Sequence, residues 1–357
     1  MTKKILALAL GILLIAAMAA CGNGGQTQPP PTGGETPAAT NDGASDATAE
    51  EVRPVRLGLV TQSQGNPFHI QLRQAAVAYA EERGIEIVVL ASESLEEQLR
   101  VMEDLAQTRP DAIAVTAYDA AAIVTAMEAA KALGVYVFAI DNNVLDTDIV
   151  AFTGTDNVYG GEIATDWLID RVGVDGNIGL ILGAAGSFAS NARQEGFYNT
   201  LYHRAPDMNV KEVTANWQRE LGLIVANDLL IANPDLDAIF GLNDNMALGA
   251  VQAVEETGRS EVLVMGFNGT PDAVVAVYNG ELDATVVQFP ALMVQTYVDL
   301  AIDLVRYGIQ PAQRDFLIPA FVIDTELVRA VVDDGKQPTN AYEELLFPKL
   351  IDFVTNW

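Results

Sequence analysis

The feature that most constrains the fold is an alternation of short apolar runs with helical patterns, which begins at Val55 and forms two successive blocks. Most of these runs are continuously apolar, which is typical of strands that are buried on both faces of a sheet. The predicted strands of the first block are Val55–Thr61, Glu86–Ala91, Ala112–Thr116, Tyr136–Ile140 and Ile149–Thr153. Those of the second block are Ile178–Leu182, Val210–Thr214, Ala238–Leu242, Val262–Phe267 and Ala284–Gln288.

Helical periodicity fills the segments between the predicted strands. Leu95, Leu99 and Met102 recur at spacings of four and three residues, and Ser94 with Glu97 forms a capping box in front of them. Strands that alternate with helices predict parallel sheets with helices on both faces. Because this pattern occurs twice, we predict an α/β fold of two doubly wound parallel-sheet lobes.

The N-terminus carries the pattern of an export signal. Two lysines precede an apolar run of 13 residues (5–17), which is too short to span a bilayer comfortably. The string Met18-Ala19-Ala20-Cys21 then resembles the lipobox of bacterial lipoproteins, in which the cysteine is acylated and becomes the mature N-terminus. We therefore predict a signal peptide over residues 1–21 and lipid attachment at Cys21, the only cysteine of the chain. An ordinary secretory signal with an incidental cysteine is the alternative.

Composition separates a tether from the folded part of the chain. Residues 22–52 contain no Leu, Ile, Phe, Tyr or Trp, so they lack the apolar surface that would offset their ordering entropy, and we predict a disordered tether. The roughly 300 residues that follow suffice for two domains. The formal net charge of -28 disfavours nucleic acid and anionic lipid surfaces as partners, which leaves the N-terminal lipid as the membrane attachment.

Polar and aromatic residues gather after the predicted strands, where doubly wound sheets bind their ligands. Planar amide, carboxylate and guanidinium groups match the hydroxyls of a sugar, and aromatic rings cover its apolar faces. The candidate ligand-binding residues are Asn66, Phe68, His69, Asp141, Asn142, Arg193, Trp217, Asn243, Asn268 and Gln288. Taken singly, an Asn or Asp in such a place is usually a turn former or a helix cap, and the pattern across seven strand ends is what indicates a site.

Four strings of the sequence are distinctive. They are Asn66-Pro67-Phe68, Asp156-Asn157 with Gly160-Gly161, Asn243-Asp244-Asn245-Met246-Ala247-Leu248-Gly249-Ala250, and Gly266-Phe267-Asn268-Gly269-Thr270-Pro271-Asp272. Together they resemble type I periplasmic binding proteins of sugar ABC transporters, most of all the ribose-binding group. The resemblance covers roughly residues 55–324. It implies a cleft between two lobes, which close on the ligand and then dock on a permease.

The resemblance also implies a hinge of three crossovers, near Gly154–Asp156, Phe289–Pro290 and Phe316–Pro319. The N-terminal lobe then comprises residues 53–155 and about 290–316, and the C-terminal lobe comprises residues 156–289 and about 317–333. Residues 334–357 form a C-terminal extension, which we interpret as an amphipathic helix packed on a lobe. A partner-binding tail is the alternative for this segment.

By motif, the resemblance assigns pocket roles to Asn66, Phe68, Asp141, Arg193, Trp217, Asn243 and Gln288. Three positions depart from the ribose-binding pattern. His69 stands in place of a phenylalanine, Asn142 in place of an arginine, and Asn268 in place of an aspartate. The last two changes remove one positive and one negative charge, so Asp141 remains balanced by Arg193, which favours a neutral polyhydroxy ligand. A pentose, a hexose and a polyol all stay open. We interpret His69 as an aromatic wall, with a pH-sensitive contact near pH 6–7 as the alternative.

The resemblance predicts a solute-binding lipoprotein that captures a neutral monosaccharide and delivers it to an ABC transporter permease. It would be a monomer outside the cytoplasm, anchored by lipid to the cell membrane and facing a periplasm or the outer cell surface. A sugar sensor for chemotaxis or signalling also uses lobe closure and is the alternative. An enzyme with a nucleotide cofactor is disfavoured, because no Gly-x-Gly-x-x-Gly turn follows the first strand, and no cofactor is expected. Two histidines also disfavour a His-based metal site.

Overall fold

The computed structural model describes residues 53–331 of the chain. The predicted signal peptide (1–21), tether (22–52) and C-terminal extension (334–357) lie outside the described residues. Within residues 53–331, no helix has both the length and the apolar character that a membrane crossing requires.

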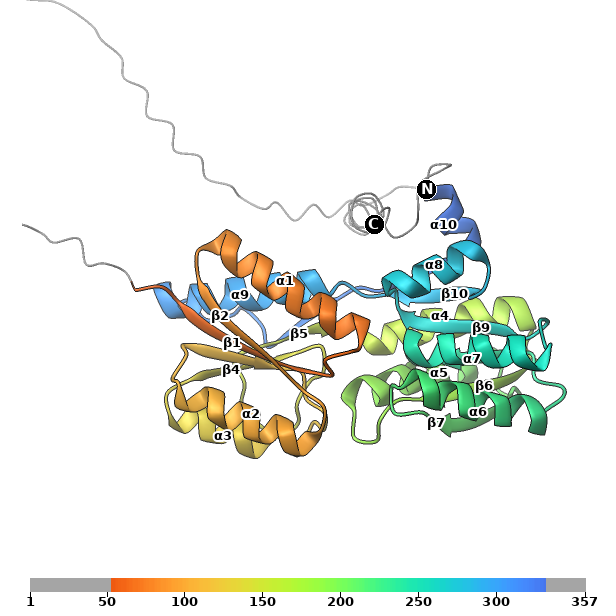
Figure 1. Cartoon of the computed structure of the whole chain (residues 1–357), viewed down its shortest axis with the longest axis horizontal. Coiled ribbons are helices and arrows are strands. Elements are labelled where there is room, and N and C mark those ends of the chain that lie inside the picture. Colours follow the sequence, from red (N-terminus) through yellow and green to blue (C-terminus); the bar gives the residue numbers. More distant parts are fainter. Residues whose placement is uncertain (1–52, 332–357) are drawn as a thin grey trace, which may run out of the picture. The chain divides into compact units, whose positions relative to one another are not determined.

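The first lobe is built on a six-stranded sheet with the order β11-β5-β4-β3-β1-β2 (Figure 1). All of its neighbouring strands run parallel. The strands are β1 (Arg56–Gln62), β2 (Glu86–Ser92), β3 (Ala112–Val115), β4 (Tyr136–Ile140), β5 (Phe152–Thr155) and β11 (Asp315–Ile318). One face is covered by α1 (Pro67–Arg83) and α9 (Pro290–Tyr307), and the other by α2 (Leu95–Gln107) and α3 (Val124–Ala132).

The second lobe has a six-stranded sheet with the order β12-β10-β9-β8-β6-β7, in which only β12 runs antiparallel to its neighbour. Its strands are β6 (Asn177–Leu182), β7 (Asn209–Thr214), β8 (Ala238–Gly241), β9 (Leu263–Asn268), β10 (Ala284–Val287) and β12 (Phe321–Asp324). Its helices are α4 (Asn157–Val172), α5 (Phe188–Arg204), α6 (Arg219–Ala232), α7 (Asp244–Thr257), α8 (Pro271–Asn279) and α10 (Thr325–Val331). The predicted fold class of two doubly wound lobes is confirmed.

The chain passes between the two sheets three times. It leaves the first sheet after β5, returns to it through α9 after β10, and leaves it again between β11 and β12. Pro319 and Ala320 form the last connection, and Ile318 still pairs with Thr155 in the first sheet.

All ten predicted strands are present, but β11 and β12 were not predicted as strands. Each has only four residues, and β11 lies at the edge of its sheet with alternating exposed and partly buried positions. A short edge strand lacks the continuous apolar run by which the buried strands were recognised. The fifth strand also begins later than predicted, at Phe152 instead of Ile149, although Val150 N already donates to the carbonyl of Val137 on β4 at 2.9 Å.

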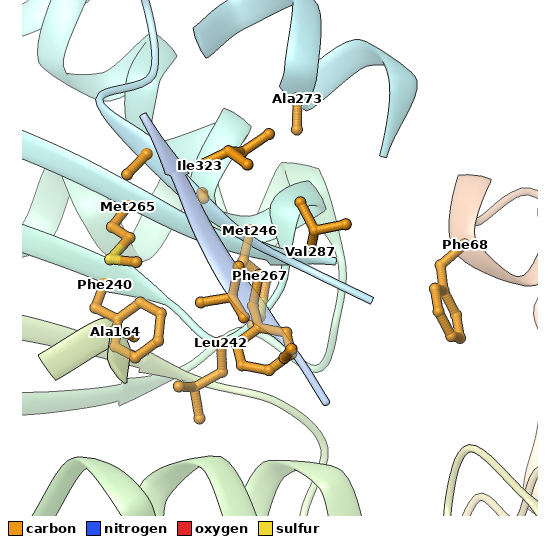
Figure 2. Packing of buried hydrophobic residues seen from close by; sticks show 14 of the residues in the cluster. Phe68, Ala164, Phe240, Leu242, Met246, Met265, Phe267, Ala273, Val287 and Ile323 are labelled. Atoms are coloured by element: carbon orange, nitrogen blue, oxygen red, sulfur yellow. The ribbon is translucent and has the colours of Figure 1, made fainter. Parts of the chain in front are cut away.

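The core of the second lobe gives the site a rigid floor. Figure 2 shows Phe267, Met246 and Val287 packed beside one another on the strands and helix of this lobe, with Phe68 of α1 standing apart from them. Phe267 and Met246 are fully buried. Because such interiors are close-packed, residues at the ends of these strands are held in fixed positions.

Candidate ligand-binding site

A cavity of about 560 Å³ lies at the carboxyl ends of strands from both sheets. The parallel direction of the strands explains the position of the cavity, because parallel strands present their carboxyl ends at one edge of a sheet. All ten candidate residues predicted from the sequence line this cavity: Asn66, Phe68, His69, Asp141, Asn142, Arg193, Trp217, Asn243, Asn268 and Gln288. The structure therefore brings together residues that are up to 222 positions apart, from Asn66 to Gln288.

Asp141 and Arg193 are the buried charges of the cavity wall. Asp141 directly follows β4 with a left-handed backbone (φ 64°), and its Oδ2 accepts a hydrogen bond of 2.9 Å from Asn142 Nδ2. Burial raises the pKa of Asp141 to about 6, against the opposing attraction of Arg193. Burial likewise lowers the pKa of Arg193 to about 10, against the attraction of Asp141 and Asp244. Each charge thus offsets part of the desolvation penalty of the other.

Several contacts within the second lobe hold Arg193 in place. Its Nε donates to Asn157 Oδ1 at 2.8 Å, and its Nη1 donates to the carbonyl of Leu242 at 2.6 Å. Its guanidinium carbon also lies 3.7 Å from the centre of the Phe267 ring, which is a cation–π distance. Because these contacts fix the guanidinium before any ligand arrives, little side-chain entropy is lost on binding.

Asn66 and Asn243 cap helices and also line the cavity. Asn66 Oδ1 accepts from Phe68 N at 3.0 Å at the start of α1, where Pro67 fits the first helical position. Asn243 Oδ1 accepts from Met246 N at 2.9 Å at the start of α7. Capping occupies the oxygen of each side chain. Each amide nitrogen remains as a donor at the cavity, although that of Asn243 also reaches the carbonyl of Trp217 at 3.3 Å.

Asn268 and Gln288 form a connected pair at the ends of β9 and β10. Gln288 Nε2 donates to Asn268 Oδ1 at 2.6 Å, and Arg193 Nη1 approaches the same oxygen at 3.5 Å. Asn268 adopts a positive φ of 140°, which side-chain-bearing residues rarely take, so its geometry is held by the structure around it. The oxygen of Asn268 is thus occupied, whereas the buried Oε1 of Gln288 has no hydrogen-bond partner within residues 53–331.

Asn142 lines the cavity and joins the two lobes. Its Oδ1 accepts from Ser187 Oγ at 3.2 Å and from Ala189 N at 3.0 Å, both at the start of α5 in the second lobe. Between them, Phe188 reaches the first lobe and meets the Phe152 ring edge-on at 5.9 Å. Both ends of the Asn142 amide are therefore engaged with protein atoms, which favours a role in holding the lobes together.

The aromatic residues give the cavity its apolar walls. Phe68 is buried on the first lobe and His69 follows it, with their rings edge-to-face at 5.4 Å. Trp217 stands on the second lobe with a left-handed backbone (φ 67°) and packs against Gly183, where a Cβ would come within 2.1 Å of the indole. Burial lowers the pKa of His69 to about 3, so the imidazole is neutral at pH 6–7, which disfavours the alternative of a pH-sensitive contact.

Several cavity residues were not among the predicted ones. Tyr118 lines the cavity after β3, and its hydroxyl donates to the carbonyl of Ser92 at 2.8 Å. The same strand-end rule that selected the other residues would have found Tyr118 after the third strand. Arg219 and Asp272 also line the cavity and form an exposed ion pair of 3.4 Å. Asp272 ends the fourth distinctive string but was not assigned a pocket role, and Arg219 belongs to none of the four strings.

The chain matches known proteins over most of its folded part. The family profile described as a periplasmic binding protein domain matches residues 57–309. The ribose import binding protein RbsB of Bacillus subtilis (strain 168) is 34% identical over 254 residues, which is 70% of this chain and 81% of that protein. The D-allose-binding periplasmic protein of Escherichia coli (strain K12) is 31% identical over 263 residues, 70% of this chain and 84% of that protein.

Solved structures agree with these sequence relatives. A periplasmic solute-binding protein of Actinobacillus succinogenes 130z with bound D-allose has a TM-score of 0.72 and 29% identity, over 78% of this chain and 100% of that one. The Caulobacter myo-inositol-binding protein has a TM-score of 0.73 and 26% identity, over 78% and 97%. With its fold, its cavity at the strand ends and a family match over more than two thirds of its length, this chain belongs to the periplasmic binding protein family.

Proposed function

We propose that this chain is a non-enzymatic solute-binding protein that captures one neutral monosaccharide or polyol between its lobes and delivers it to an ABC transporter permease. The observation that carries the proposal is the convergence of ten sugar-compatible side chains on one cavity whose buried charges, Asp141 and Arg193, balance. A charged ligand would bring an unmatched charge into this desolvated space, which is costly. The proposal is also supported by relatives whose names specify ribose and D-allose and by solved structures that hold D-allose and myo-inositol.

The ligand class is tested by thermal unfolding against a panel of pentoses, hexoses and polyols that includes D-ribose, D-allose and myo-inositol. A ligand at 100 times its Kd stabilises the native state by about 2.7 kcal/mol, which is a shift of several degrees for a chain of this size. Sugar acids and amino acids serve as charged controls. Recovery of the bound sugar unchanged distinguishes a binding protein from an enzyme. If no sugar or polyol raises the Tm, the ligand class is wrong.

We further propose that the protein acts as a monomer outside the cytoplasm, with residues 1–20 removed and Cys21 acylated as the mature N-terminus. Two features support the anchor: the string Met18-Ala19-Ala20-Cys21 and the apolar-poor segment 22–52, which would serve as a tether. Because a single acylated residue can hold a protein at a bilayer without a spanning helix, removing the thiol removes the attachment.

Replacing Cys21 with serine is therefore expected to move the protein from the membrane fraction to the soluble extracytoplasmic fraction. Fractionation followed by immunodetection measures this directly, and the sugar-dependent Tm shift of the released protein shows that it is folded. Continued membrane association of the Cys21→Ser variant would contradict the anchor and leave the binding function untouched.

A further inference from the structure

His69 is buried in the cavity wall without a hydrogen-bond partner. It lies in the first turn of α1, its side chain is 6% exposed, and it lines the cavity. Its Nδ1 is closed off from solvent and makes no hydrogen bond with any described residue. A polar group buried in this way costs about 1–3 kcal/mol, whereas a phenylalanine would fill a similar volume without that penalty. Packing alone therefore does not account for an imidazole here.

The surroundings of His69 keep its ring neutral. Burial, together with the positive charge of Arg73, lowers its pKa to about 3. Arg73 is itself occupied by Thr61 Oγ1 and by the carbonyls of Ser63 and Gln64, at distances from 2.8 to 3.0 Å. A neutral imidazole carries one N–H donor and one bare nitrogen acceptor. His69 can therefore both donate to and accept from an oxygen that bears a proton.

Gln288 provides the matching unpaired group on the second lobe. Its Nε2 is engaged by Asn268, and its Oε1 is buried without a partner among the described residues. Three of the buried polar atoms that lack a partner among the described residues belong to residues lining this cavity: His69 Nδ1 on the first lobe, and Gln288 Oε1 and Asp272 Oδ1 on the second. Hydroxyl groups of a ligand are the partners that would satisfy these atoms.

We infer that His69 is a specificity-determining residue whose imidazole hydrogen-bonds one hydroxyl of the bound sugar, while Gln288 accepts from another. This inference rests on the proposed function and refines it. It predicts that the protein distinguishes a sugar from the single-deoxy derivative that lacks the hydroxyl facing α1. A phenylalanine in the same place would cover the sugar but could not make that distinction.

The test compares wild type with His69→Phe and His69→Gln. The probe is the sugar or polyol of the thermal panel with the largest Tm shift, together with its single-deoxy derivatives. We expect one deoxy derivative to bind wild type roughly 5- to 150-fold more weakly than the parent, the range that corresponds to one unpaired buried group. His69→Phe should bind the parent more weakly by a similar factor and should no longer distinguish that derivative. His69→Gln, which keeps a donor and an acceptor, should restore part of the discrimination.

The Tm of the ligand-free variants separates this role from a structural one. Because His69→Phe removes an unsatisfied buried group, its ligand-free Tm should equal or exceed that of wild type. A lower Tm with unchanged discrimination would mean that His69 serves packing, and would overturn the inference while leaving the proposed function standing. If no sugar or polyol binds wild type, the proposed function and this inference fail together.

Discussion

Replacing Arg193 with alanine is expected to cause a large loss of sugar affinity while the two lobes remain folded. Arg193 is 3% exposed, and its charge offsets that of Asp141 in the cavity. Removing one member of a buried pair of opposite charges costs about 2–5 kcal/mol, or roughly 30-fold to several thousand-fold in Kd. Isothermal titration with the sugar that gives the largest Tm shift measures this loss, and circular dichroism checks the fold.

The same helix provides a matched control. Arg204 lies at the end of α5 and pairs with Asp166 at 2.6 Å and Asp170 at 2.7 Å on the protein surface. Exposed pairs of this kind contribute little, so Arg204→Ala should bind the sugar as wild type does. Arg193→Lys should also lose most of the affinity, because a lysine keeps the charge but cannot contact Asn157 and Leu242 with a planar fork. If Arg193→Ala bound within a few-fold of wild type, the assignment of this cavity as the binding site would be wrong.

Sugar affinity is expected to fall as the pH drops below 6, because the ligand hydroxyls would then meet a protonated Asp141. Burial raises the pKa of this carboxyl to about 6, and a ligand that donates to it favours the ionised form. With binding coupled to loss of one proton, Kd should be nearly constant at pH 7–8 and roughly tenfold higher at pH 5. His69 stays neutral over this range, because its pKa is about 3.

An Asp141→Asn variant separates the titration of Asp141 from the titration of neighbouring groups. Asp244 also has a pKa raised to about 6 by burial, but its carboxylate is bonded to Thr270 and Thr285 and does not line the cavity. The variant should bind weakly and show a flat profile between pH 5 and 8. A tenfold loss at pH 5 that persisted in Asp141→Asn would assign the titration to another group.

Titration calorimetry is the right measurement for this prediction, since the Tm of the free protein responds to pH for other reasons. The raised pKa of Asp141 means that the folded state binds a proton before the unfolded state does, so this residue favours folding as the pH falls from about 6 toward the unfolded value of 3.8. His69 acts in the opposite sense, because its unfolded form takes up a proton near pH 6.5 and its folded form only near 3. The two effects oppose each other in a Tm.

The sequence predicts positions in this fold better than it predicts contacts. Arg193 and Gln288 could be placed at one cavity because buried parallel strands are recognisable and their ends coincide in space. The partners of Asn142 could not be predicted, because they depend on how α5 of one lobe meets the loop after β4 of the other. The missing partner of His69 depends in the same way on every side chain packed around it. The edge strand β11 was not predicted for a local reason, since four residues are too few to show a recognisable hydrophobic pattern.

The attachment of Asn142 to the start of α5 has a mechanical consequence. Arg193 stands on that same helix, about one turn beyond Ala189, so α5 carries both the guanidinium of the cavity wall and the hydrogen bond to Asn142 that joins the lobes. A ligand that displaces the guanidinium would therefore also strain the hydrogen bonds between Asn142 and the start of α5. Ligand occupancy would thereby alter the contact between the lobes, and a membrane partner could respond to that change.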